Sequence, residues 1–239
     1  MPTFKIFRYN PKSGGPAYFQ TYELPEKKGM TVLDGLYHIL ENIDSTLAFR
    51  SSCRQGVCGS CAMHIGGQYR LACETQVVDI GNLVAIRPLS HMKIVRDLVV
   101  DLDPFFAKYT EIKPYLIPAG EPPVREFKQS PKERAKLDPY VDCILCAACY
   151  SSCPVAGTDE KYLGPQALLK ALRYVADSRD GATGERLAYL ASDFGAFRCH
   201  TIFNCQQVCP KELDPSSAIA KLKMKSLWAK FTGRMRQTG

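Results

Sequence analysis

The first part of the chain has the alternating apolar and polar pattern of β-strands. The segments TFKIFRY (residues 3–9) and AYFQTYEL (17–24) are rich in aromatic and β-branched residues, and the turn-like NPKSGGP separates them. This pattern predicts an antiparallel hairpin. A helix is expected over TVLDGLYHILENI, because its apolar residues recur at helical spacing. Thr31 and Asp34 resemble a capping box at its start.

A second hairpin is expected at Gly66-Gly67, which AMHI and QYRLA flank, and LVAIRP is expected to complete the sheet. Residues 101–126 lack helical or strand periodicity and are interpreted as a connector. This stretch contains Pro104, Pro114, Pro118, Pro122 and Pro123.

The remainder of the chain has a helical pattern. Helices are expected in GPQALLKALRYVADS, GERLAYLASDF and DPSSAIAKLKMKSLWAKF, the last with Asp214 as its N-cap. The sequence therefore predicts a mixed domain over residues 1–100, a connector over 101–126 and a helical domain over 127–239.

Composition narrows the class of protein. With 46% hydrophobic and 23% charged residues, the chain is an ordinary globular protein rather than a disordered or fibrous one. No apolar run approaches the ~18 residues of a membrane span, and the N-terminus lacks the apolar core of a secretory signal. A soluble protein in a reducing compartment is expected. The net charge of +7 permits a nucleic-acid partner, but no basic stripe interleaved with aromatics occurs, so none is expected.

Eleven cysteines in a reducing compartment indicate metal binding or catalysis rather than disulfides. The first four have the spacing Cys53-x4-Cys58-x2-Cys61-x11-Cys73. This is the pattern of plant-type ferredoxins, in which four thiolates hold a 2Fe-2S cluster. The alternative is a structural zinc site, but zinc sites favour two Cys-x2-Cys knuckles and fit the x4 gap poorly.

The second group is the run Cys143-x2-Cys146-x2-Cys149-x3-Cys153-Pro154, which is typical of bacterial ferredoxins. The same template returns 56 residues later as Cys199-x2-Ile202-x2-Cys205-x3-Cys209-Pro210. In two-cluster ferredoxins the fourth cysteine of each run ligates the other cluster. This rule assigns one complete 4Fe-4S site to Cys143, Cys146, Cys149 and Cys209.

The partner site has only three thiols, Cys153, Cys199 and Cys205, because Ile202 occupies the fourth position. An iron atom without a strong ligand is easily lost, so a 3Fe-4S cluster is expected there. Ile202 is expected to pack against that cluster and to shield it from water. The three assignments use all eleven cysteines.

Three kinds of cluster in one short chain indicate conduction of single electrons. The chain has neither a GxGxxG nor a Walker A motif. Oxidation or reduction of an organic substrate needs a cofactor that carries the chemistry. That cofactor is therefore expected on a partner subunit.

Four segments resemble motifs of the iron-sulfur subunit of the succinate dehydrogenase / fumarate reductase family, in the family's order: SCRQGVCGSCAMHIGG, CILCAACYSSCPV, YLGPQALLKALRYVADSRD and RCHTIFNCQQVCPKELDP. The resemblance covers nearly the whole chain. It implies an α+β fold, with a β-grasp 2Fe-2S ferredoxin domain followed by an α-helical dicluster ferredoxin domain.

The same resemblance implies two kinds of partner. One is a flavoprotein subunit whose FAD interconverts succinate and fumarate, and the other is a cytochrome b-type membrane anchor that handles quinone. This chain is then the electron-transfer subunit of a succinate:quinone oxidoreductase. Its expected location is peripheral, on the cytoplasmic face of the cell membrane or the equivalent matrix face.

The resemblance also places Pro154, His200, Ile202 and Lys223 near the quinone. His200 could bond or protonate a quinone oxygen, since histidine titrates near neutrality; alternatively it orders the cluster loop. Many ubiquinone-reducing members carry tryptophans after the first Cys-Pro, and this chain has none there, so the sequence leaves the quinone type and the direction open.

The C-terminal tail is basic and has no acidic residue after Asp214. Its charges are Lys221, Lys223, Lys225, Lys230, Arg234 and Arg236. They form either a solvated helix face or a surface attracted to anionic lipid head groups.

Two other functions fit parts of the pattern. A soluble relay, as in thiol-dependent fumarate reductases or heterodisulfide reductases, is one, but those proteins tend to add Cys-Cys-Gly modules, which are absent here. The other is a zinc-stapled interaction protein, for which the purified chain would be colourless.

Overall fold

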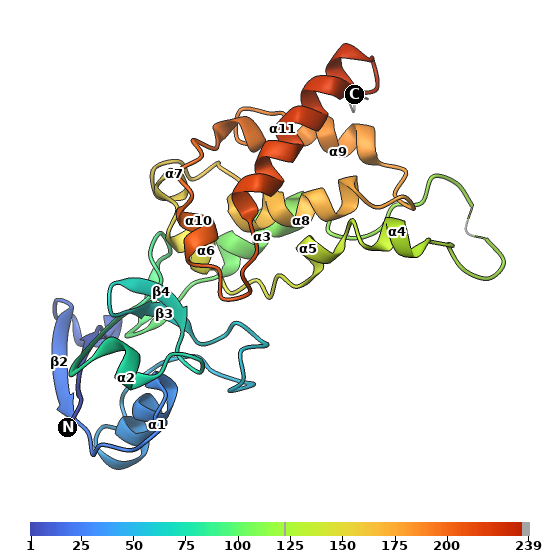
Figure 1. Ribbon diagram of the computed structural model, residues 1–239. Coiled ribbons are helices and arrows are strands. Elements are labelled where there is room, and N and C mark those ends of the chain that lie inside the picture. The colour runs from blue at the N-terminus through green and yellow to red at the C-terminus, as the bar shows by residue number, and fades with distance from the viewer. Residues whose placement is uncertain (122, 236–239) are drawn as a thin grey trace. The chain divides into compact units, whose positions relative to one another are not determined.

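The computed structural model describes residues 1–121 and 123–235 (Figure 1), so Pro122 and Arg236 lie outside the described residues. The chain forms two compact units, Met1–Pro104 with Ile144–Ser152, and Phe105–Cys143 with Cys153–Gly239. The first unit thus includes a short segment of the run that begins at Cys143. The sequence-based division at residues 100 and 126 stays a prediction.

The first unit is built around a mixed five-stranded sheet. Its strands follow the order β2-β1-β5-β3-β4, in which β1 and β5 are parallel and the other neighbours antiparallel. These strands are β1 (Thr3–Arg8), β2 (Tyr18–Glu23), β3 (Ala62–Ile65), β4 (Gln68–Leu71) and β5 (Leu83–Arg87). Both predicted hairpins, β1–β2 and β3–β4, are confirmed.

The unit also contains smaller elements. They are the 3-10 turn η1 (Pro11–Ser13), the helices α1 (Val32–Asn42), α2 (Val77–Ile80) and α6 (Ala148–Ser151), and the two-stranded ribbon β6 (Ile94–Arg96) and β7 (Val99–Val100). Of these, α6 belongs to the segment Ile144–Ser152 and packs against β4.

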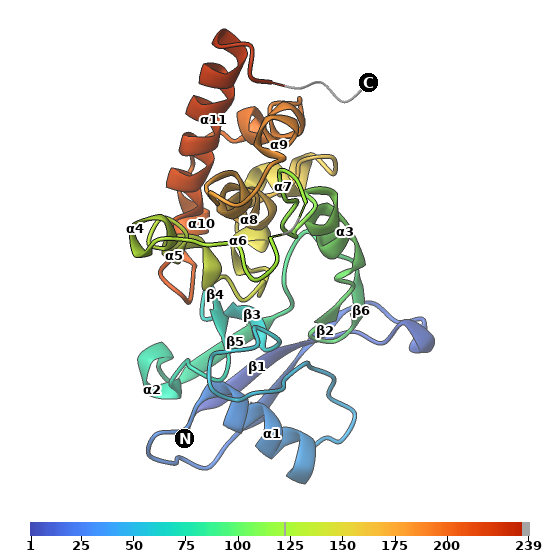
Figure 2. The ribbon, with the colours of Figure 1, turned by 90° about the vertical axis from the view of Figure 1, so that its right-hand side faces the viewer.

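Helix α1 covers one face of the sheet (Figure 2). The predicted capping box begins it, since the Asp34 amide donates to the Thr31 hydroxyl (3.1 Å) and the Thr31 amide donates to the Asp34 carboxylate (3.0 Å). Phe4 of β1 packs so closely under the helix that a side chain at Gly35 would lie 2.4 Å from its ring. The sheet therefore packs closely against α1, as in the predicted β-grasp fold.

The second unit consists of helices gathered around α8 (Pro165–Val175). Every residue of α8 except Arg173 is buried, and α11 (Pro215–Phe231), α9 (Thr183–Leu190) and α5 (Asp138–Val141) pack against it (Figures 1 and 2). The remaining elements are α3 (Asp103–Glu111), α4 (Pro131–Arg134), α7 (Pro154–Thr158), η2 (Ala196–Arg198) and α10 (Asn204–Gln207).

The ends of two helices bear on the predictions. Asp214 caps α11 as expected, because its carboxylate accepts a hydrogen bond from the Ser217 amide (2.8 Å). Within the predicted connector, the expected lack of helical structure was wrong for residues 103–111, which form α3. Pro104 lies in its first turn, where proline is tolerated, and Phe105 is fully buried. Among the described residues, no helix is both long and apolar enough to cross a bilayer.

Candidate iron-sulfur sites

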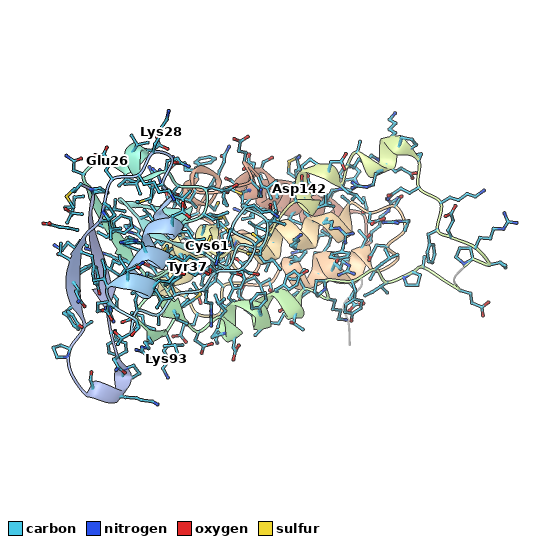
Figure 3. The ribbon with its side chains drawn as sticks, turned by 90° about the horizontal axis from the view of Figure 1, so that it is seen from below. Glu26, Lys28, Tyr37, Cys61, Lys93 and Asp142 are labelled. Atoms are coloured by element: carbon cyan, nitrogen blue, oxygen red, sulfur yellow. The ribbon has the colours of Figure 1, made fainter. Side chains whose placement is uncertain are left out.

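The first four cysteines lie in the first unit, on the loop between α1 and β3 and just after β4. Cys53 and Cys58 are half-buried, whereas Cys61 and Cys73 are buried. Figure 3 shows Cys61 in the interior of the unit, with Glu26 and Lys28 at its outer edge. The loop therefore directs part of the set inward and leaves part near the surface.

Backbone amides of this loop point at the sulfurs. The Cys53 sulfur accepts from the amides of Val57 and Cys58, both at 3.3 Å, and the Cys73 sulfur accepts from the Gly56 amide at 3.2 Å. Amide donors stabilise the anionic thiolate and, in iron-sulfur proteins, adjust the cluster potential. The amides are thus already arranged for negatively charged sulfurs.

The thiols differ in acidity according to their surroundings. Burial alone would raise the pKa of Cys58, but hydrogen bonds from Ser60 and Cys53 outweigh it and lower that pKa to about 6. Burial raises the pKa of Cys61 to about 12, and the neighbouring Cys73 thiol adds to this effect. Cys61 and Cys73 therefore lie close together, and the buried Cys61 thiol is of the kind that a metal centre would have to ionise.

Glycine is required where this loop contacts the run that begins at Cys143. Gly59 has a φ of +73°, and a side chain there would lie 2.9 Å from the Cα of Cys146, which belongs to the same unit. The backbone that carries Cys58 and Cys61 thus contacts the backbone that carries Cys146. Only glycine satisfies both the conformation and the close approach.

The three cysteines of the predicted 3Fe-4S site line one small cavity in the second unit. Its walls consist of Cys153, Pro154, Val155, Tyr162, Pro165, Cys199, His200, Thr201, Ile202, Phe203, Asn204, Cys205 and Ile219. The structure therefore brings together the three thiols and, beside them, Pro154, His200 and Ile202. The side chain of Ile202 is 48% exposed, so it forms part of the cavity's outer rim.

The two cysteine runs share a backbone conformation. Leu145 and Ala147, two and four residues after Cys143, have φ values of +53° and +64°. The corresponding residues after Cys199 are Thr201 and Phe203, with φ values of +56° and +68°. Non-glycine residues seldom adopt this conformation, and a β-branched threonine least of all. The two runs thus match in backbone conformation as well as in cysteine spacing. Ile202 occupies the position that Cys146 has in the run that begins at Cys143.

Such left-handed residues turn successive backbone amides toward one side, which forms the concave anion site found around many iron-sulfur clusters. In the second loop, the Thr201 amide donates to the Cys199 sulfur at 3.4 Å. The Leu213 amide donates to the Cys209 sulfur at the same distance. The backbone amides that donate to these sulfurs therefore fit an anionic cluster held by thiolates.

Tyr162 is the polar side chain of this cavity that sequence reasoning missed. It is fully buried, and its hydroxyl has no hydrogen-bond partner of ordinary geometry among the described residues. Burial raises its pKa, and the nearby Cys199 and Cys153 thiols raise it further. A buried hydroxyl that meets the Cys199 sulfur, with the Cys153 and Cys205 sulfurs nearby, fits a cavity built for a polar group. The residue lies in the YLGP segment, but no spacing rule identifies it.

The other predicted residues are placed as follows. Cys146 and Cys149 belong to the first unit, and Cys143 and Cys209 to the second. The ammonium of Lys223 donates to the backbone carbonyl of Cys199 (2.8 Å) rather than lining the cavity. In the described part of the chain, no three His, Cys, Asp or Glu side chains are grouped closely enough to hold a single metal ion.

Comparisons with known proteins match both units. Residues 3–107 match the 2Fe-2S iron-sulfur cluster binding domain, and residues 136–210 match the 4Fe-4S dicluster domain. Among solved structures, a chain of the Mycobacterium smegmatis Sdh1 complex in the apo form has a similar fold, with a TM-score of 0.84 at 23% identity over 96% of this chain and 97% of that one.

Two curated relatives are similar in sequence over most of their length. The succinate dehydrogenase iron-sulfur subunit of Paracoccus denitrificans is 47% identical over 92% of this chain and 86% of the relative. The mitochondrial succinate dehydrogenase [ubiquinone] iron-sulfur subunit of Dictyostelium discoideum is 47% identical over 92% of this chain and 80% of the relative. With this similarity, and with an N-terminal ferredoxin unit and a helical unit in the predicted order, the chain belongs to the succinate dehydrogenase iron-sulfur subunit family.

Proposed function

We propose that this chain is the electron-transfer subunit of a membrane-bound succinate dehydrogenase / fumarate reductase. Oxidation of succinate to fumarate releases two electrons and two protons, and reduction of a quinone to a quinol takes up two of each. Iron-sulfur clusters pass electrons singly, so the chain conducts the two electrons one after the other between FAD on a flavoprotein subunit and quinone at a membrane anchor.

Each centre has its proposed ligands. Those of the 2Fe-2S centre are Cys53, Cys58, Cys61 and Cys73; those of the 4Fe-4S centre are Cys143, Cys146, Cys149 and Cys209; those of the 3Fe-4S centre are Cys153, Cys199 and Cys205. The amide donors to the sulfurs support the first set. The second set follows from the cysteine spacing.

One observation carries the proposal for the three-iron centre. Cys153, Cys199 and Cys205 line a single cavity together with Ile202, in a loop that repeats the backbone of the preceding cysteine run. A hydrocarbon at the fourth position cannot bind iron. The cavity therefore supports a cluster that lacks one metal atom.

Two exposed surfaces of the second unit support a quinone and a membrane anchor as partners. Pro154, His200 and Ile202 are exposed on the rim of the three-cysteine cavity, where an acceptor would approach the last centre. The second surface lies on α11, whose Ile219 lines the same cavity. Its later turns expose Met224, Leu227, Trp228 and Phe231.

This second surface, the α11 stripe, has the spacing i, i+3, i+4, i+7 of one helix face. It lies opposite the buried face that includes Leu222, Ser226 and Ala229. Exposed Lys225 and Lys230 flank it. An apolar face bordered by lysines suits a site beside anionic lipids, which supports a peripheral location on the cytoplasmic or matrix face, held by a cytochrome b-type anchor.

Electron paramagnetic resonance (EPR) on anaerobically purified protein tests the assignment. The wild-type chain should contain iron and sulfide for one centre of each kind and give the oxidised-state signal of 3Fe-4S. The Ile202→Cys variant should lose that signal, because a fourth thiolate retains the missing iron, whereas Ile202→Leu should keep it. An unchanged signal in a folded Ile202→Cys variant would mean that the ligand assignment is wrong.

Two further outcomes would overturn the function itself. A colourless wild-type protein with stoichiometric zinc would indicate a zinc-stapled interaction protein. A complex that reduces fumarate with thiols but does not react with quinone in native membranes would indicate the soluble relay instead.

A further inference from the structure

The hydroxyl of Tyr162 is fully buried, and it meets the Cys199 thiol with a geometry outside that of an ordinary hydrogen bond. The side chain is 0% exposed, and no protein group among the described residues bonds its oxygen with ordinary geometry. Leaving such a group without a good hydrogen bond is unfavourable, and native proteins seldom do so without a partner or a function. The hydroxyl therefore points to a group that normally completes the cavity.

The surroundings define the chemistry of that group. Near Tyr162 the cavity wall is apolar, with Val155, Pro165 and Ile219. Cys199, Cys153 and Cys205 are the neighbours whose charge acts on the hydroxyl, in that order. The acceptors on its side of the cavity are therefore sulfur atoms.

We propose that Tyr162 donates a hydrogen bond to a sulfur atom of the three-iron centre and thereby raises its reduction potential. This inference rests on the proposed function, because it takes Cys153, Cys199 and Cys205 as the ligands. Reduction adds one electron to the centre and makes its sulfurs more negative. A donor to sulfur then stabilises the reduced form more than the oxidised form, and the buried, low-dielectric setting strengthens the effect.

The role is one of tuning rather than binding. Tyr162 would supply no ligand, so its loss should leave the centre assembled. It would instead set how readily the last proposed centre of the relay accepts an electron. Among the described residues, no other side chain in the cavity wall combines full burial with a polar atom that lacks an ordinary hydrogen bond.

The test is the Tyr162→Phe variant of the whole complex, which removes one oxygen and retains the ring. An EPR redox titration of the 3Fe-4S signal should show the ratio of reduced to oxidised centre falling about five- to tenfold at a fixed potential. For a one-electron couple, tenfold corresponds to a shift of about 59 mV to more negative potential. The intensity of the fully oxidised signal should not change.

Tyr174→Phe is the matched control. Tyr174 is also a buried tyrosine of the second unit, but its hydroxyl already donates to the carbonyl of Pro114 (2.5 Å). This variant also loses a buried hydroxyl, and it should leave the 3Fe-4S titration unchanged. Equal shifts in both variants would indicate general loosening of the unit and would overturn the inference.

A second substitution covers the case in which Tyr162→Phe loses the centre. Fluorotyrosine incorporated at position 162 keeps the shape of the ring and makes the hydroxyl a stronger donor, so the potential should move in the positive direction. An intact signal with no shift in either substitution would refute the hydrogen bond. Absence of the signal from the wild-type protein would instead refute the proposed function.

Discussion

The ammonium of Lys223 donates a hydrogen bond of 2.8 Å to the backbone carbonyl of Cys199. This contact joins the middle of α11 to the first residue of the second cysteine loop. The resemblance to the family had placed Lys223 near the quinone. In the structure its ammonium holds the backbone of a proposed ligand, so its substitution should affect the loop before any acceptor is bound.

Lys223→Met is expected to destabilise the three-cysteine loop. A hydrogen bond from a charged donor contributes about 1.5–3 kcal/mol, and methionine keeps much of the side-chain length without the donor. The 3Fe-4S EPR signal should decay faster during incubation in urea, while the visible circular dichroism of the 2Fe-2S centre is unaffected. Lys225→Met removes an exposed lysine two residues away and should leave both signals as in the wild type.

Gly59→Ala should disturb the place where the first cysteine loop meets Cys146. The added methyl group would lie 2.9 Å from the Cα of Cys146, and the residue has a φ of +73°. Gly67→Ala separates the steric contact from the cost of the backbone conformation. Gly67 also has a positive φ, +89°, but an added methyl group there would have no atom within 4 Å.

The conformational cost should be similar in both glycine variants, about 1–2 kcal/mol. Gly59→Ala should additionally reduce the occupancy of the 2Fe-2S and 4Fe-4S centres, measured as iron content and EPR intensity. If the two variants lose iron equally, the contact with Cys146 does not matter for assembly of the centres.

Local patterns in the sequence predicted the five strands of the main sheet and the helices α1, α8, α9 and α11. Both hairpins, the Thr31 capping box and the Asp214 cap depend on residues close together in the chain, and all are present. The spacing of the cysteines predicted that Cys153, Cys199 and Cys205 would come together. Spacing succeeds here because these cysteines lie on short loops that repeat one backbone conformation.

Contacts between distant segments could not be predicted in this way. Nothing in the sequence indicated that Ile144–Ser152 packs with the first unit, or that Gly59 contacts Cys146. The position of Tyr162 beside the three cysteines could not be predicted either, because an aromatic residue before a helix is usually an ordinary residue of the hydrophobic core. Helix α3 was missed because its prolines suggested a loop, although proline fits a helix's first turn.

Arg8→Met should unfold the first unit at lower urea concentration. Arg8 is buried and its guanidinium contacts the carboxylates of Asp97 (3.1 Å) and Asp44 (2.5 Å). Removing it leaves the buried Asp97 carboxylate with only the more distant Arg96 (3.8 Å) as a cationic partner, and loss of one member of a buried ion pair costs about 3–5 kcal/mol. The visible circular dichroism of the 2Fe-2S centre in urea measures this loss.

Arg134→Met provides the comparison, because Arg134 pairs with Asp138 on the surface. An exposed pair of this kind contributes about 0–1 kcal/mol, so the urea midpoint should hardly move. The double variant Arg8→Met/Asp97→Asn should recover part of the stability lost in Arg8→Met. No recovery would mean that the packing of Arg8, and not its charge, stabilises the unit.

Trp228→Ser should weaken attachment of the chain to membranes. Trp228 and Phe231 of the α11 stripe are 67% and 86% exposed, and a contiguous exposed apolar patch of this kind marks a site of interaction with a protein or a membrane. Burying one such side chain contributes about 1.5–3 kcal/mol. The fraction of the chain retained on washed native membranes should therefore fall about tenfold or more.

Val78→Ser is the control for this experiment, since Val78 is also highly exposed but lies in the first unit. It should leave membrane retention unchanged, and Trp228→Ser should leave the EPR signals of all three centres intact. Binding of the wild-type chain to anionic vesicles that contain no other protein would indicate that lipid covers the α11 stripe. Binding to native membranes alone would indicate a protein partner. Full retention of Trp228→Ser on native membranes would show that α11 does not attach the chain there.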